Sequence, residues 1–153
     1  MATTTATLSI VSADLTSDAL SLSNTKNLNA AGVATGLSQV EGVARKRLAG
    51  DASNAKNYII ADASDAKFTE DGAAKIYIKN LSTSNAEFLT VLVGSVSSDG
   101  ATSYTGQELG RLYGGDFLFI PWSADTAGTD SDILIQTPAN SLNQEVEYLI
   151  IFE

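Results

Sequence analysis

The residues best suited to do chemistry in this chain are carboxylates gathered in polar stretches. They form three groups, which are Asp62 with Asp65, Glu70 with Asp71, and Asp125 with Asp130 and Asp132. Oxygen-rich loops can bind Ca²⁺, which takes about six to eight oxygen ligands. None of the groups has the spacing of an EF-hand loop, and the 125–132 stretch lacks a Glu at its end to bind in a bidentate manner. The spacing favours acidic turns over a metal site, and we expect no metal or other cofactor.

Acid–base catalysis has few candidates in this sequence. Glu145 and Glu147 share one face of a predicted strand, but a glycosidase pair needs two carboxylates that flank a cleft, and nothing in the sequence indicates one. The chain has no His and no Cys, so the commonest general base and the thiolate nucleophile are both missing. We therefore expect a protein that is not an enzyme.

Aromatic residues offer a different chemistry, which is stacking against sugars. Trp122 and the five tyrosines could form such a platform, with Tyr104 in a polar stretch as the most exposed of them. Trp122 directly follows an apolar strand, which favours a place at the edge of the core. Gly110, Gly114 and Gly115 fit neither the P-loop nor the GxGxxG pattern. Carbohydrate binding remains an alternative function.

The net charge of −9 argues against nucleic acid as a partner, because binding to phosphates requires clustered Lys and Arg. The charge is unevenly distributed. Residues 1–50 carry four basic and three acidic residues, whereas residues 112–153 carry seven acidic and no basic residues. This division predicts that the two parts meet different partners, or that the N-terminal part of one subunit meets the body of another. No stretch has the length of a membrane span or the pattern of a signal peptide, so we expect no membrane partner.

Residues 1–55 are predicted to form an extended N-terminal arm. They are rich in small polar residues, contain no aromatic residue, and include two short alternating stretches, Thr7–Val11 and Ala19–Ser23. These two stretches predict a hairpin that has too little apolar area to be stable alone. It must lie on the body, on a neighbouring subunit or on another protein. The residues that we expect to make these contacts are Leu8, Ile10, Leu20, Leu22, Arg45, Lys46 and Arg47.

The stretch Gln39–Ala49 fits either a short amphipathic helix or a strand. Gly42 inside it and Gly36 and Gly50 beside it weaken the helix, because an interior Gly costs about 1 kcal/mol relative to Ala. The triplet Arg45–Arg47 is the one basic cluster of the sequence. It fits either a solvated face or a contact with an acidic partner surface.

Residues 56–153 are predicted to form an all-β body. Lys75–Val96 has the outline of a hairpin, and Asp116–Trp122 alternates apolar residues on both phases, which is typical of a strand buried on both faces. Pro121 lacks an N–H, so it ends the ladder or sits at a sheet edge. About seven body strands are expected, from Asn57–Ala61 to Glu145–Phe152. Their spacing and the polar turns between them predict an antiparallel β-sandwich that is jelly-roll-like.

The body resembles the small β-sandwich structural proteins of tailed bacteriophage virions, including capsid decoration (cement) proteins. The resemblance covers residues 56–153, and it is carried by the order of the strands KIYIKN, EFLTVLV, DILI and VEYLIIF. Its most family-like part is the Leu-x-x-Gly-Asp-x-x-x-x-Pro-Trp run at Leu112–Trp122. A resemblance to this class implies no catalytic residues.

The resemblance implies a homotrimeric decoration protein that binds the major capsid protein and stabilises the phage head. Trimers fit the local threefold sites of a capsid. The expected location is the virion, assembled in the cytoplasm of the host. A tail or head–tail junction protein and a carbohydrate-binding sandwich module are the alternatives.

Overall fold

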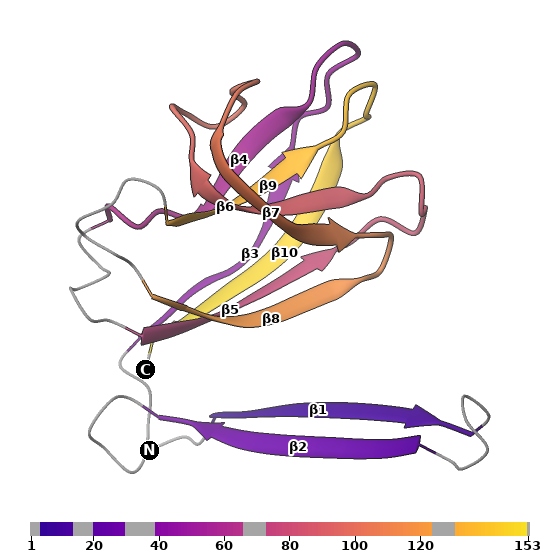
Figure 1. Ribbon diagram of the computed structural model, residues 1–153, viewed down its shortest axis with the longest axis vertical. Coiled ribbons are helices and arrows are strands. Elements are labelled where there is room, and N and C mark those ends of the chain that lie inside the picture. The colour runs from indigo at the N-terminus through magenta and orange to yellow at the C-terminus, as the bar shows by residue number, and fades with distance from the viewer. Residues whose placement is uncertain (1–3, 14–19, 30–38, 66–72, 124–130, 153) are drawn as a thin grey trace. The chain divides into compact units, whose positions relative to one another are not determined.

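The computed structural model describes residues 4–13, 20–29, 39–65, 73–123 and 131–152, and every regular element among them is a β-strand. Figure 1 labels these strands in chain order. They are β1 (Thr4–Ser12), β2 (Leu20–Leu28), β3 (Gln39–Leu48), β4 (Lys56–Ala61), β5 (Ala73–Asn80), β6 (Leu89–Ser95), β7 (Thr105–Leu112), β8 (Phe117–Ser123), β9 (Asp132–Thr137) and β10 (Gln144–Phe152). No helix long and apolar enough to cross a membrane occurs in this described part of the chain.

The chain divides into two compact units, residues 1–39 with Glu153, and Val40–Phe152. The first unit contains the hairpin of β1 and β2, which pair antiparallel from Thr4 opposite Leu28 to Ser12 opposite Leu20. The strand predicted at Thr7–Val11 is therefore confirmed, and the one predicted at Ala19–Ser23 is confirmed from Leu20 onward, because Ala19 lies outside the described residues; β1 and β2 have nine residues each.

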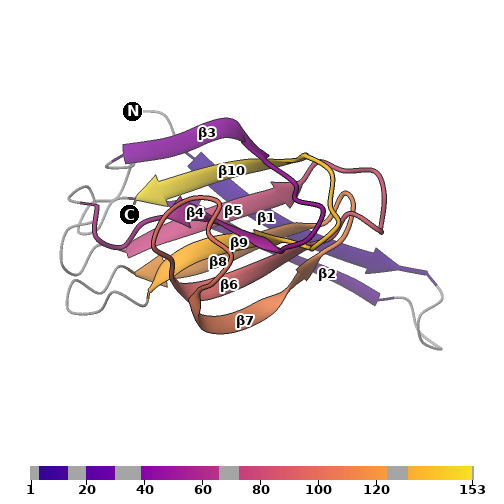
Figure 2. The same ribbon diagram turned by 90° about the horizontal axis from the view of Figure 1, so that it is seen from above.

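The second unit, the body, consists of two four-stranded antiparallel sheets. One has the strand order β3-β10-β5-β8 and the other β4-β9-β6-β7. Figures 1 and 2 show the two sheets stacked face to face, and Figure 2 shows β3 and β7 at opposite margins. The predicted antiparallel sandwich is thus confirmed, with eight strands in the described body where seven were expected.

The body includes a strand that precedes residue 56. Residues 39–48 form the strand β3, so the strand alternative for this stretch is the correct one. Because β3 is hydrogen-bonded to β10, the compact body starts at Val40, whereas the sequence boundary stood after residue 55.

The core lies between the two sheets and takes the inward-facing residues of both. Ile76 and Ile78 of β5 face Ile133 and Ile135 of β9 across this layer, and all four are fully buried. β6 is buried along most of its length and lies inside its sheet.

Two predictions about the body strands were wrong. Lys75–Val96 is not a hairpin, because β5 and β6 belong to different sheets and residues 81–88 connect the two. β8 is not buried on both faces, because it is the edge strand of its sheet and leaves Phe117 and Phe119 exposed. Pro121 is tolerated within β8 because an edge strand has no second neighbour that needs its missing N–H.

Candidate interaction surfaces

The hairpin of β1 and β2 is amphipathic. Side chains alternate along a strand, so Leu8, Ile10 and Leu22 share one face, which also carries Leu28. The opposite face carries Thr and Ser residues of both strands, and Thr7 and Thr25 there approach within 3.2 Å through their hydroxyl oxygens. Leu8, Ile10 and Leu22 remain 46–48% exposed. We call the face with these three residues the apolar face of the hairpin.

The other residues that the sequence predicted to make contacts are Leu20 and the basic triplet. Leu20 pairs through its backbone with Ser12, and its side chain lies outside the described part. The triplet does not act as one cluster, because alternation along β3 separates Lys46 from its two neighbours. Arg45 and Arg47 are exposed, whereas Lys46 is half-buried.

Lys46 holds the outer edge of β4. Its Nζ donates to the carbonyl oxygen of Ile59 at 2.8 Å and forms an ion pair with Asp99 at 2.7 Å. The other carboxylate oxygen of Asp99 accepts a 2.7 Å hydrogen bond from the N–H of Ile59. Asn57, two residues earlier, exchanges backbone hydrogen bonds with Gly100 and Ala101. The outward-facing backbone groups of Asn57 and Ile59 are therefore satisfied, which hinders another strand from pairing with β4 there.

The outer face of the sheet β3-β10-β5-β8 combines aromatic and basic residues. The register aligns three cross-strand rows from β10 through β5 to β8, which are Glu147–Lys79–Phe117, Leu149–Tyr77–Phe119 and Ile151–Lys75–Pro121. Arg45 and Arg47 extend this face along β3. We call this surface the aromatic–basic face. Four of the nine basic residues of the chain lie on it, in a protein of net charge −9.

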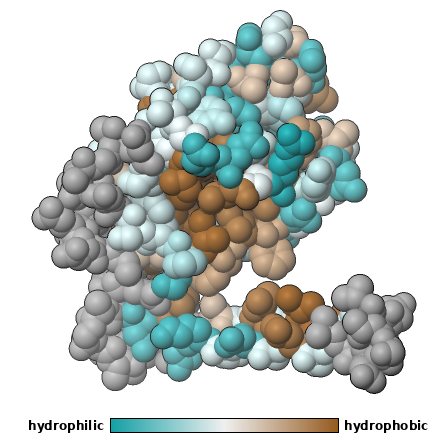
Figure 3. All heavy atoms as spheres, viewed as in Figure 1, coloured by the Kyte–Doolittle hydropathy of each residue, from teal (hydrophilic) through white to brown (hydrophobic). Residues whose placement is uncertain are grey.

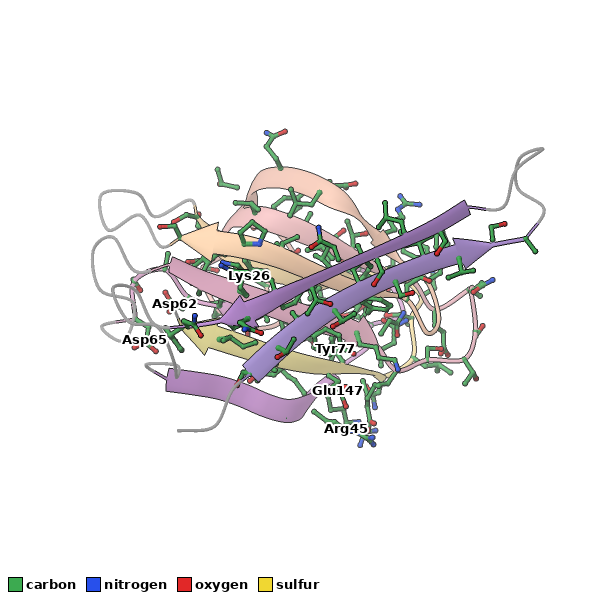
Figure 4. All side chains as sticks on the ribbon, turned by 90° about the horizontal axis from the view of Figure 1, so that it is seen from below. Lys26, Arg45, Asp62, Asp65, Tyr77 and Glu147 are labelled. Atoms are coloured by element: carbon green, nitrogen blue, oxygen red, sulfur yellow. The ribbon has the colours of Figure 1, made fainter. Side chains whose placement is uncertain are left out.

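The aromatic side chains of this face are accessible. Phe117 is 58% and Phe119 39% exposed, and the rings of Phe117 and Tyr77 lie 6.2 Å apart. Seen from below in Figure 4, Tyr77 and Glu147 lie close together, and Arg45 lies at the margin formed by β3. Burial raises the pKa of the Tyr77 phenol above its usual value of 10.0, and the charge of Glu147 and a hydrogen bond to it raise the pKa further.

A second group of exposed residues lies along β7, the edge strand of the other sheet. Between Gly110 and Glu108, which pair with Val91 and Leu92, the extra residue Leu109 forms a bulge and is exposed. Figure 3 shows hydrophobic residues gathered in the region of the edge strands β7 and β8. A bulge disrupts the ladder locally, so it makes β7 a poor template for a further strand.

Two carboxylates of the sequence-predicted acidic groups, Asp62 and Asp132, accept hydrogen bonds that support the local fold. Asp62 accepts hydrogen bonds from the N–H and hydroxyl of Ser64, and buried Asp132 accepts one from the N–H of Ala63. No group of three or more potential metal ligands occurs among the residues that the structure describes. Residues 66–72 and 124–130, which hold Glu70, Asp71, Asp125 and Asp130, lie outside that part.

Trp122 lies at the edge of the core, as predicted. The residue is 8% exposed, and its Nε1 donates a 2.7 Å hydrogen bond to the carbonyl oxygen of Ser131. A buried ring cannot serve as an open sugar-stacking platform. Tyr104 is half-buried.

The sequence pattern did not predict the aromatic–basic face. Phe117 and Phe119 alternate with apolar Leu118 and Ile120, and this pattern looked like burial on both faces. Pro121 was the signal that could have corrected it, because Pro favours an edge strand.

No family model, curated protein or solved structure matches this chain.

Proposed function

We propose that this chain is a non-enzymatic structural protein of a tailed-phage virion. Within that class we propose a capsid decoration (cement) protein that forms homotrimers and binds the major capsid protein. The observation that carries the proposal is the exposed aromatic–basic face, on which Phe117 and Phe119 of the edge strand β8 lie next to β5 with Lys79, and Arg45 lies on the opposite edge strand β3. Aromatic residues and Arg are the types enriched where proteins bind each other.

The strand order supports a jelly roll as the finer description of the sandwich. Counted from β3 as the first strand, the two sheets have the orders 1-8-3-6 and 2-7-4-5. All but one of the connections between consecutive strands pass from one sheet to the other, which supports a jelly roll. Jelly rolls of eight strands occur in viral capsid and lectin domains and in cupins. A fold of this kind hosts several functions, so the exposed face and not the fold is the argument for assembly.

The trimer is tested by size-exclusion chromatography with light scattering at micromolar concentration. The expected mass is three times that of the 15.9 kDa chain. A monomer of 15.9 kDa would count against the proposed assembly.

The location is tested by immunogold labelling of purified virions with antibodies raised against the protein. Label distributed over the head supports decoration. Label confined to the tail or to the head–tail junction replaces decoration by the alternative location. Virions without label overturn the virion role.

A further inference from the structure

One buried side chain of the body has polar atoms that no protein group satisfies. Gln144, the first residue of β10, is 3% exposed. Neither its Nε2 nor its Oε1 has a hydrogen-bond partner among the residues that the structure describes. A buried amide without hydrogen bonds is costly, and nearly all buried polar groups of folded proteins bind either protein or water. The amide of Gln144 therefore needs a ligand that the described chain does not supply.

The direction of this side chain follows from the alternation along β10. Gln144 has the phase of Val146, which is fully buried and belongs to the core between the two sheets. Glu145 has the opposite phase and is exposed. The amide of Gln144 thus points inward, at the end of the sandwich where β10 begins.

A second unsatisfied polar atom lies in the connection from β9 to β10. The hydroxyl of Ser141 is also buried and without a hydrogen-bond partner in the described part of the chain. The backbone at Ser141 packs closely on Gly50, where a Cβ would strike the carbonyl oxygen of Ser141. The N–H of Gly50 also donates a 3.0 Å hydrogen bond to the Oδ1 of Asn143. The backbone on both sides of Ser141 is therefore held in place, and its hydroxyl has to find its partner where it is.

We propose that Gln144 and Ser141 bind an internal water molecule. The chemistry of the unsatisfied atoms selects this ligand, because Nε2 donates, Oε1 accepts and a serine hydroxyl does either. The Nε2 hydrogens would repel a cation and Oε1 would repel an anion, whereas water both donates and accepts. Internal waters make about three hydrogen bonds to buried polar groups that otherwise lack partners.

The water links the connection between β9 and β10 to the interior end of β10. It thereby fixes the turn that presents Leu142, which is 74% exposed. The water site does not depend on the proposed virion role, so the two are tested by separate measurements.

Nuclear magnetic resonance of the isotope-labelled natural chain detects the water directly. The side-chain NH₂ protons of Gln144 are assigned through their covalent connections to the backbone. We expect cross-peaks from these protons to the water resonance, with opposite signs in NOESY and ROESY spectra. Opposite signs mark a water that tumbles with the protein and distinguish it from proton exchange. Gln107, which is exposed on β7, is the control in the same sample and should show no such cross-peaks.

Ser141→Ala is a second control, because a hydroxyl proton that exchanges with the solvent can give the same cross-peaks. The amide of Gln144 alone still offers a donor and an acceptor to the water. We therefore expect the cross-peaks to remain in Ser141→Ala.

Gln144→Met tests the site through the midpoint of thermal unfolding. Met has a similar length to Gln but no amide. Because the substitution removes the hydrogen bonds to the water and leaves the Ser141 hydroxyl with fewer partners, we expect the midpoint to fall by about 3–6 °C. An amide that nothing satisfies would instead be relieved by an apolar side chain, and the midpoint would rise. Gln107→Met, the same change at an exposed position, should shift the midpoint by less than about 2 °C.

Three results would overturn the water site. The first is the absence of the Gln144 cross-peaks in the natural chain, a measurement that needs no variant to fold. The second is their loss in Ser141→Ala, which assigns them to the serine hydroxyl. The third is a rise of the midpoint in Gln144→Met, measured on protein whose circular dichroism matches that of the natural chain.

Discussion

The side chain of Asn80 ties the end of β5 to the end of β7, because its Nδ2 donates a 3.1 Å hydrogen bond to the carbonyl oxygen of Leu112. Asn80 is fully buried. Its Nδ2 also donates to the carbonyl oxygen of Glu87 at 2.8 Å, and its Oδ1 accepts from the N–H of Ser82 at 3.0 Å. One side chain thus joins strands of both sheets to the connection that crosses between them. Its backbone N–H donates to the carbonyl oxygen of Asp116 and its carbonyl accepts from the N–H of Gly115, both directly before β8.

Replacement of Asn80 is therefore expected to be costly. Asn80→Ala leaves the carbonyl oxygens of Leu112 and Glu87 without their donor, and an unsatisfied buried group costs about 1–3 kcal/mol. We expect the free energy of unfolding to fall by about 2–4 kcal/mol, measured by urea denaturation at pH 7. The control is Asn85→Ala, at an exposed position of the same connection, which should change stability by less than about 0.5 kcal/mol. Equal effects of the two substitutions would contradict this role of Asn80.

The element types of the body could be predicted from the sequence, but the pairing of the strands could not. Alternation of apolar residues marks Asp132–Thr137 as a strand, and the structure places β9 there. The same alternation does not specify a partner. Ile78 and Leu89 are close in sequence but lie in different sheets, because the side chain of Asn80 supports a crossover where the polar residues suggested a hairpin turn.

The candidate surfaces were predictable only in part, for a related reason. Leu8 and Ile10 stand among Thr and Ser, so their phase reveals an amphipathic ribbon. Phe117 and Phe119 alternate with other apolar residues. Which of the two alternating sets is exposed depends on the place of β8 at the edge of its sheet. Lys46 shares a basic triplet with Arg45 but faces β4, and the ion pair with Asp99 spans 53 residues. Local sequence does not encode such long-range pairing.

The satisfied backbone groups at the outer edge of β4 predict an effect on the association of chains as well as on the free energy of unfolding. Asp99→Ala removes the acceptor for the N–H of Ile59 and the partner of Lys46, and we expect a loss of about 1.5–3 kcal/mol. Light scattering should then show association that increases with concentration, because an open strand edge can pair with another chain. Asp99→Asn keeps the acceptor and removes the charge, so its loss should be about 1 kcal/mol or less, without association. Association of both variants alike would show that the edge is not what Asp99 protects.

The contact of β6 with β7 predicts opposite outcomes for two glycines. A Cβ on Gly94 would lie 2.7 Å from the Cα of Gly106 on the paired strand and would also strike the carbonyl oxygen of Thr105. These are backbone atoms that cannot move aside without breaking the ladder, so Gly94→Ala should cost about 1–3 kcal/mol. At Gly110, on the same pair of strands, a Cβ meets nothing within 4 Å, and Gly110→Ala should be neutral or stabilise by about 0.4–1 kcal/mol. Thermal denaturation of the two variants tests this prediction. A Gly94→Ala variant as stable as the natural chain would contradict the close approach of the two backbones.

Tyr77 and Glu147 predict the alkaline limit of stability. The pKa of the Tyr77 phenol is raised above 10.0 by burial first, and then by the charge of Glu147 and a hydrogen bond to it. The folded protein therefore holds the phenolic proton more tightly than the unfolded chain does. The stability contributed by Tyr77 is fully present below pH 10, the unfolded pKa, and is lost as the pH rises through the folded pKa.

Urea denaturation at pH 8 to about 11 should accordingly show a smaller decline in the free energy of unfolding for Tyr77→Phe than for the natural chain. Comparing the two chains cancels the titration of the lysines and of the other tyrosines in the same range. Glu147→Gln removes the negative charge beside the phenol, so the pKa of Tyr77, followed by the ultraviolet absorbance of tyrosinate, should move back towards 10.0 without reaching it, because burial remains. A Tyr77 that titrates at or below 10.0 in the folded protein would contradict both the burial of the phenol and its contact with Glu147.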